Sequence, residues 1–139
     1  MPSPTTETSI WMALNARVES LTLSPALPVR YTTQAADGAL TGYLLVTHIR
    51  NTTLRPLIGS SAPHHYRGIL QIDVMSKLNQ DEAVAAQIAG TVADHFPADL
   101  LLTFDVVTVR VTKRPNIGQT MTQATNLKTP VSVEYEAYQ

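Results

Sequence analysis

The chain has 139 residues, of which 44% are hydrophobic and 15% charged, with ten lysine and arginine residues against eleven aspartate and glutamate residues. This length is that of one domain, and a formal charge of -1 lacks the basic excess typical of nucleic-acid-binding proteins. No run of about 18 apolar residues predicts a membrane span, and residues 1–7 lack the basic and apolar blocks of a secretory signal. The absence of cysteine excludes disulfides, thiolate zinc sites and a cysteine nucleophile. We expect a soluble, cytoplasmic protein with one domain over residues 1–139.

The first predicted element is a helix that begins with Ser3 as its cap and Pro4 as its first residue. Proline is favoured there because it lacks only an amide donor that has no partner in the first turn. One apolar stripe recurs every three or four residues and consists of Ile10, Leu14, Val18 and Leu21, with Trp11 beside it. Ser24, Pro25 and Pro28 end this helix, since a residue before proline avoids the helical region.

Two strands and a short β-prone piece are expected in the middle of the chain. The β-prone piece covers Val29 to Thr33 and precedes a turn signal at Asp37-Gly38, after which Tyr43 to Arg50 alternates as a strand. Residues 51–65 break every pattern, and a loop of this length is usually functional or disordered. The clearest strand covers Arg67 to Ser76, with Leu70, Ile72 and Val74 on one face and Gln71 and Asp73 on the other.

A second helix follows this strand and is expected to begin at Asn79, with Glu82 as the capping-box partner three residues later and Asp81 at the positive helix end. Its apolar stripe consists of Val84, Ala85, Ile88, Ala89, Val92 and Phe96, and Pro97 closes it. The small alanine side chains allow close approach to a sheet.

Two further strands complete the prediction, one over Phe104 to Arg114 and one over Val131 to Ala137, separated by a polar connection from Pro115 to Lys128. The order of helix, strands, helix and strands predicts an α+β fold: a single layer of mainly antiparallel sheet with two helices packed on one face.

Candidate catalytic groups have structural explanations. His64 and His65 are the only histidine cluster, but neighbouring residues on an extended segment point in opposite directions, which suits a shared metal ion poorly. Gly59-Ser60-Ser61 lacks the glycine-serine elbow of hydrolases, and no glycine-rich phosphate loop is present. The carboxylate pairs Asp81-Glu82 and Glu134/Glu136 fit a helix start and a solvated strand face. We therefore predict no catalytic residue, no cofactor and no metal site.

Basic residues are the more informative feature. Arg110, Lys113 and Arg114 gather at the end of one predicted strand, while Arg50, Arg55 and Arg67 flank the first long loop. They are either ordinary surface charge, which protects strand edges, or part of a surface that faces a partner.

Several segments together resemble the tail-terminator-like proteins of long-tailed bacteriophages. They are Arg67-Gly68-Ile69-Leu70-Gln71-Ile72-Asp73-Val74, an alanine-rich helix ending in Asp94-His95-Phe96, Pro115-Asn116-Ile117-Gly118, Pro130-Val131-Ser132-Val133-Glu134-Tyr135, and a first helix with Ile10-Trp11, Ala13-Leu14 and Arg17. The resemblance extends over nearly the whole chain in the right order. Residues 51–65 match no part of the family pattern.

The resemblance implies a structural virion protein without enzymatic activity. Such proteins form a hexameric ring on the end of the tail tube, stop tube growth and provide the docking surface for neck or head-completion proteins. It also implies assembly in the host cytoplasm, a place in the virion at the head–tail junction, and phage DNA passing through the ring without sequence-specific binding.

Ring subunits use heterologous contacts, for which exposed strand edges and long loops are suited. We expect subunit or tube contacts in both long loops and at the basic residues. The predicted contact residues are Arg50, Arg55, His64, His65, Tyr66, Arg110, Lys113, Arg114, Asn116 and Lys128. Alternatives are another neck or tail-completion protein of the head–tail junction, a small metal-dependent hydrolase that uses His64, His65 and an acid, and a ligand-binding module with an apolar pocket.

Overall fold

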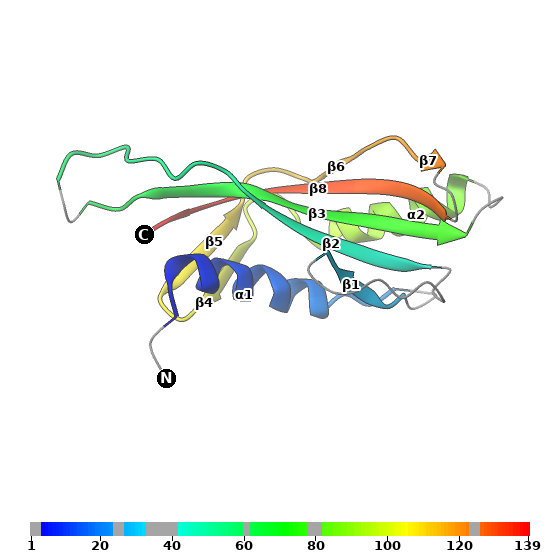
Figure 1. Cartoon of the computed structure of the whole chain (residues 1–139), viewed down its shortest axis with the longest axis horizontal. Coiled ribbons are helices and arrows are strands. Elements are labelled where there is room, and N and C mark those ends of the chain that lie inside the picture. The colour runs from blue at the N-terminus through cyan, green and yellow to red at the C-terminus, as the bar shows by residue number, and fades with distance from the viewer. Residues whose placement is uncertain (1–3, 24–26, 33–41, 60–61, 78–81, 123–125) are drawn as a thin grey trace.

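The computed structural model describes residues 4–23, 27–32, 42–59, 62–77, 82–122 and 126–139. Two helices, α1 (Thr6–Glu19) and α2 (Glu82–Asp94), contact one curled sheet, as the sequence predicts (Figure 1). The strands are β1 (Val29–Tyr31), β2 (Tyr43–Arg50), β3 (His65–Lys77), β4 (Leu101–Phe104), β5 (Val107–Val111), β6 (Asn116–Ile117), β7 (Met121–Thr122) and β8 (Asn126–Tyr138).

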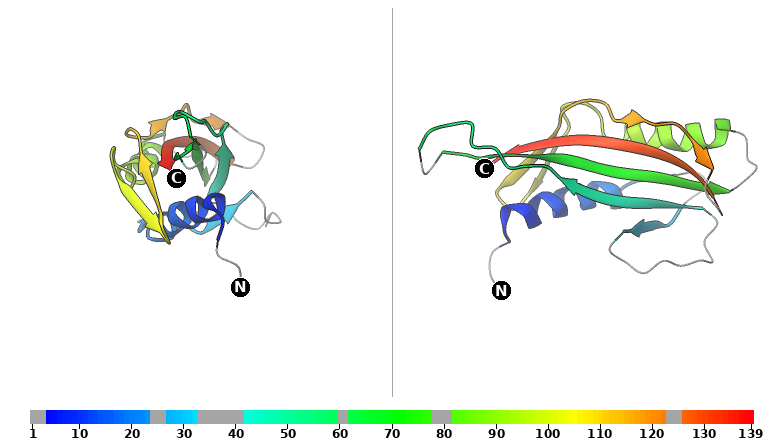
Figure 2. Two further views of the ribbon diagram at one scale, coloured as in Figure 1. Left: turned by 90° about the vertical axis from the view of Figure 1, so that its left-hand side faces the viewer. Right: turned by 45° about the horizontal axis from the view of Figure 1, so that its top comes forward.

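The strand order is β1-β2-β3-β8-β5-β4, and β6 and β7 pair with β8. All of these described pairs are antiparallel except β1 with β2, which is parallel. The two longest strands, β3 and β8, lie at the centre and pair along their whole length. Viewed end-on, the sheet curls so that α1 lies between β2 and the β4–β5 hairpin (Figure 2). Curling of this kind is the expected result of strand twist.

The alternation predicted for the central strand is confirmed on its inner face, where Leu70, Ile72 and Val74 are fully buried. Their core partners come from both helices and from β2, β5 and β8. On the outer face Asp73 is buried, and its carboxylate is compensated by a hydrogen bond from Gln71 over 2.8 Å and by Lys128 Nζ at 3.6 Å.

The first helix begins two residues later than predicted. Its cap is Thr5, whose hydroxyl accepts a hydrogen bond from the Thr8 amide over 3.2 Å, and Pro4 lies outside the helix. The helix ends at Glu19 with Ser20 as its C-terminal cap, well before the prolines. Leu21 therefore lies beyond the helix, although it still packs against the core.

The second helix buries most of its predicted stripe. Ala85, Ile88, Ala89 and Val92 are buried, and Phe96 fills the core just beyond the helix end. Val84 is the exception, with 41% of its surface exposed. α2 packs against β8 and β3 through the other members of the stripe, and this packing leaves Val84 outside the contact.

The strand predicted from Phe104 to Arg114 is confirmed only over β5, which is shorter than predicted. β5 is the second strand of a hairpin that the sequence did not predict, in which β4 turns into β5 through Asp105 and Val106. Asp105 has a φ of 54°, a left-handed conformation that aspartate tolerates better than most residues. The valines at 107, 109 and 111 are buried, as predicted.

The connection predicted from Pro115 to Lys128 is more regular than expected. It contains β6 and β7, and β8 already begins at Asn126. These two short strands follow β5 along the same edge of β8, opposite the edge that pairs with β3. Each of these strands pairs with β8 over only two residues.

Several sequence features lie outside the described residues: the predicted cap Ser3, the helix-ending Ser24 and Pro25, the turn at Asp37-Gly38, the serines of Gly59-Ser60-Ser61, and the predicted second helix start at Asn79 and Asp81. Neither α1 nor α2 is long and apolar enough to cross a membrane, and the described residues contain no other α-helix.

Candidate protein–protein interface

An arm extends from the sheet between β2 and β3, and we define it by the described residues 51–59 and 62–64. Its root continues the ladder, since Leu54 and His65 exchange backbone hydrogen bonds of 2.7 and 2.8 Å. Figure 1 shows the arm reaching past the start of α1, with the C-terminus beside it. Leu57 is 56% exposed, and Ile58 is fully exposed. The irregular loop of the sequence is thus a projecting hairpin that holds apolar side chains in water.

The histidines at the arm root have separate environments. The Nε2 atom of His65 lies 3.0 Å from the Glu136 carboxylate, and its ring stacks on Tyr138 with centroids 4.5 Å apart. His64 instead pairs through its backbone with Gln139. Tyr66, the next residue on β3, is half-buried and packs against the core. The structure brings His65 and Tyr66 into the root of the arm, where they support it.

Most of the predicted contact charges are paired within the chain. Arg110 binds both Asp99 and Glu136, Lys113 lies 3.5 Å from Glu134, and Arg114 lies 3.1 Å from Asp94. Hydrogen bonds from Arg110 and His65 lower the pKa of the Glu136 carboxyl. The acids that pair with these three cations lie on β8, at the end of α2 and, in the case of Asp99, just before β4.

Three arginines at or near the arm differ from these paired cations. Arg50, Arg55 and Arg67 are exposed, and none of them forms an ion pair in the described part of the chain. Arg67 borders an open groove of about 350 Å³ on the outer face of the sheet, together with Ile69 and Glu134. Net positive charge is therefore concentrated at the arm.

The remaining predicted contacts lie elsewhere. Asn116 is exposed on β6, and Lys128 is half-buried on β8 against Asp73. Ile117 and Met121 beside them are 39% and 42% exposed. The structure does not bring this group together with the arm, because β6 and β7 pair with the opposite half of β8.

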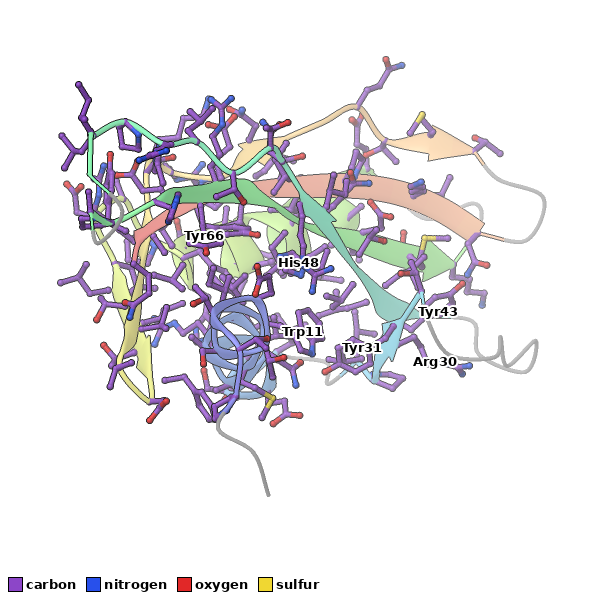
Figure 3. All side chains as sticks on the ribbon, turned by 60° about the vertical axis from the view of Figure 1, so that its left-hand side comes forward. Trp11, Arg30, Tyr31, Tyr43, His48 and Tyr66 are labelled. Carbon is purple, nitrogen blue, oxygen red and sulfur yellow. The ribbon has the colours of Figure 1, made fainter. Side chains whose placement is uncertain are left out.

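An aromatic cluster that sequence reasoning missed lies on the inner face beside the arm. Trp11 stacks on His48 with centroids 5.5 Å apart and meets Tyr31 edge-on at 5.8 Å (Figure 3). His48 in turn shares a hydrogen bond with the Tyr135 hydroxyl. Tyr135 passes over Gly68, where a Cβ atom would lie only 2.6 Å from both its hydroxyl and the Ile49 carbonyl. Only glycine leaves room for this arrangement.

Burial sets the proton affinities of the cluster. Burial, with a smaller effect from the charge of Arg50, lowers the pKa of His48 to about 4. Burial likewise raises the pKa of Tyr135 to about 12. Both groups are therefore neutral at pH 7, and the Nδ1 atom of His48 is buried with no hydrogen-bond partner among the described residues.

We expect His48→Gln to flatten the acid dependence of stability. As the pH falls from 6.5 to about 4, the unfolded chain takes up a proton at His48 that the folded chain does not, so folding stability declines. The measurement is the urea midpoint of both proteins at about pH 7 and about pH 4.5. His95, whose pKa is also lowered by burial, retains part of the slope in the variant. Equal slopes in both proteins would contradict the assignment.

No group of three or more His, Asp or Glu side chains that could hold a metal ion occurs among the residues with described positions. Two hollows near the arm are open: the groove of about 350 Å³ beside Arg67 and a cleft of about 210 Å³ beside Trp11. Arginine, tyrosine and tryptophan, which line these hollows, are residue types enriched in protein interfaces.

The comparisons with known proteins agree with this view of the surface. No curated protein matches the chain. One solved structure, whose name states no function, is 26% identical with a TM-score of 0.73 over 92% of each chain. A family model described as phage tail terminator protein matches residues 9–135. The chain therefore belongs to the phage tail terminator family, whose members are structural, non-enzymatic proteins of the phage tail.

Proposed function

We propose that this chain, as one domain, forms a homohexameric ring on the end of the tail tube, stops tube polymerisation and provides the docking surface for the neck or head. The arm is the observation that carries the proposal. It exposes Leu57 and Ile58 at the end of a hairpin braced by His65, and exposed apolar groups of this kind mark surfaces that a partner covers.

The distribution of charge supports a tube contact at the arm. Arg110, Lys113 and Arg114 are already neutralised by acids of the same chain, so they offer a partner little net charge. Arg50, Arg55 and Arg67 retain theirs. A capping subunit must fit the tube end without copying the surface on which the tube grows, and an unmatched cationic arm meets both demands.

The second exposed group, around Asn116, Ile117 and Met121, suits the other side of the ring. It lies on β6 and β7, away from the arm, so the two surfaces can bind different partners at the same time. We assign the neck or head-completion protein to this group. Phage DNA passes through the lumen, without sequence-specific binding.

The test is to mix the purified chain with its tail tube subunits and to measure particle mass by light scattering and shape by negative-stain microscopy. We expect rings at tube ends and shorter tubes than those formed without the chain. Monomer alone before mixing is compatible with the proposal, because the tube can act as a template for ring closure. Monomer that persists with tube subunits present would contradict it, and a position along the neck would identify another completion protein.

The hydrolase considered from the sequence is excluded by the non-enzymatic character of the family. His65, the residue on which that hypothesis depended, is held by Glu136 and Tyr138 as part of the arm root.

A further inference from the structure

The sheet has two open edges that carry complementary features. Among the described strands, β4 pairs only with β5, which leaves its other edge unpaired. Within the described ranges, β1 and the following Thr32 cover the outer edge of β2 only as far as Val46, to which Thr32 donates a hydrogen bond. An unpaired strand edge presents backbone donors and acceptors to another chain.

The alternation of backbone groups identifies which residues face outward. Leu44 donates to Pro28 on the β1 side, whereas Asn51 donates to Arg67 on β3. Backbone groups alternate along a strand, so the N–H and C=O groups of His48 and Arg50 point to the open side of β2. On β4, Leu100 accepts from Val111 of β5, so Leu101 and Thr103 point to the open side.

Side chains beside these edges also match. A cleft of about 210 Å³ borders the open part of β2 and is lined by Trp11, Tyr31 and His48, among others (Figure 3). Arg50 stands at its rim without an ion pair in the described part of the chain. Next to β4, Val106 is 73% exposed, and no ion pair involves Asp105 within the described ranges. One edge thus presents a cation and an apolar cleft, and the other an acid and an apolar tip.

Strand direction determines how two copies would meet. Four antiparallel steps separate β2 from β4 through β3, β8 and β5, so both strands run in the same sense. Copies related head-to-tail by a modest rotation retain that sense, and β4 of one copy is then parallel to β2 of the next. β2 already accepts a parallel strand, β1, on this same edge.

We propose that the open β4 edge of one copy adds to the edge of β2 beyond Val46 in the next copy, which brings Asp105 at the end of β4 beside Arg50 at the end of β2. In this register Ile49 faces Thr103, and both side chains lie on the outer face of the joined sheet. His48 and Arg50 then exchange backbone hydrogen bonds with β4. This contact rests on the proposed ring and specifies how its subunits join.

Cysteine cross-linking tests the contact without background, since the natural chain contains no cysteine. Ile49→Cys and Thr103→Cys proteins are oxidised separately and as a mixture, with tube subunits present, and analysed on a non-reducing gel. We expect covalent dimers only in the mixture, because facing residues on neighbouring strands have the spacing that a disulfide requires. The control mixes Ile49→Cys with Ile117→Cys, an exposed position on β6, and should give none.

Each result has a defined meaning. Dimers from either single variant alone would show like-with-like edge pairing and overturn the proposal. Rings on tube ends without the mixed cross-link would overturn this contact and leave the proposed function intact. Protein that remains monomeric with tube subunits would overturn both. The mixed cross-link within ring-sized particles supports the contact.

The charge pair supplies a second measurement. Arg50→Gln and Asp105→Asn should each weaken subunit association about fivefold, the range of an interface ion pair that remains partly solvated. Asparagine retains the tolerance for a positive φ at position 105. The double variant should be no weaker than either single variant, because each removes the same pair. Losses that multiply would show that the two side chains do not meet.

Discussion

The double variant Leu57→Asp and Ile58→Asp should bind the tail tube at least about thirtyfold more weakly than the natural chain, while its melting temperature stays nearly unchanged. Central interface residues contribute about 2 kcal/mol or more each, and two acids would leave buried charges in the contact. Both side chains are exposed, so their replacement has little to disturb in the folded subunit. Co-sedimentation with preformed tubes and thermal unfolding give the two quantities.

Val84→Asp is the matched control, because it makes the same kind of change at an exposed position on α2, away from the arm. It should bind tubes normally. Unchanged tube binding by the arm variant would move the contact to the β6–β7 group, where Met121→Asp is the corresponding change. A parallel loss of folding and binding would mean that the arm is structural.

Phe96→Ala should lower the free energy of unfolding by about 3–5 kcal/mol, a large part of the stability of a domain of this size. Phe96 lies just after α2 and is the largest of the fully buried side chains among the described residues. The truncation leaves a cavity that α2 and the sheet cannot close without moving. Denaturant unfolding of both proteins measures the difference.

Val84→Ala serves as its counterpart on the same predicted stripe. Because Val84 is largely in solvent, its truncation should change stability by less than about 0.5 kcal/mol. Similar losses for the two variants would mean that α2 presents a different face to the sheet.

The position of the candidate interface in the chain was predictable from the sequence, but the individual charged residues that are free to contact a partner were not. Proline and glycine in residues 51–65 indicated a long irregular segment, and the arm is there. The three charges at the end of β5 looked equally suitable, yet Arg110 is bound by Asp99 and Glu136. Those acids lie 11 and 26 positions away in the sequence. Local patterns do not record which distant carboxylate reaches a surface arginine.

The aromatic cluster shows the same limit. Trp11, His48 and Tyr135 belong to a helix and two strands that are far apart in the chain, and no spacing rule connects them. In the sequence, Gly68 is only one residue of a segment that resembles the family. The reason for a glycine there is the Tyr135 side chain from β8, which lies where a Cβ atom would be.

The sequence by itself determined the α+β class, both helix faces apart from Val84 and Leu21, and the inner faces of the long strands, because periodicity reflects local geometry. The family resemblance was also present in short ordered segments. Only the tertiary structure decided the register of β3 with β8, the β4–β5 hairpin, the pairing of the charges and the two open edges. These depend on contacts between residues distant in sequence, where twist, packing volume and charge select one arrangement among several that the local pattern allows.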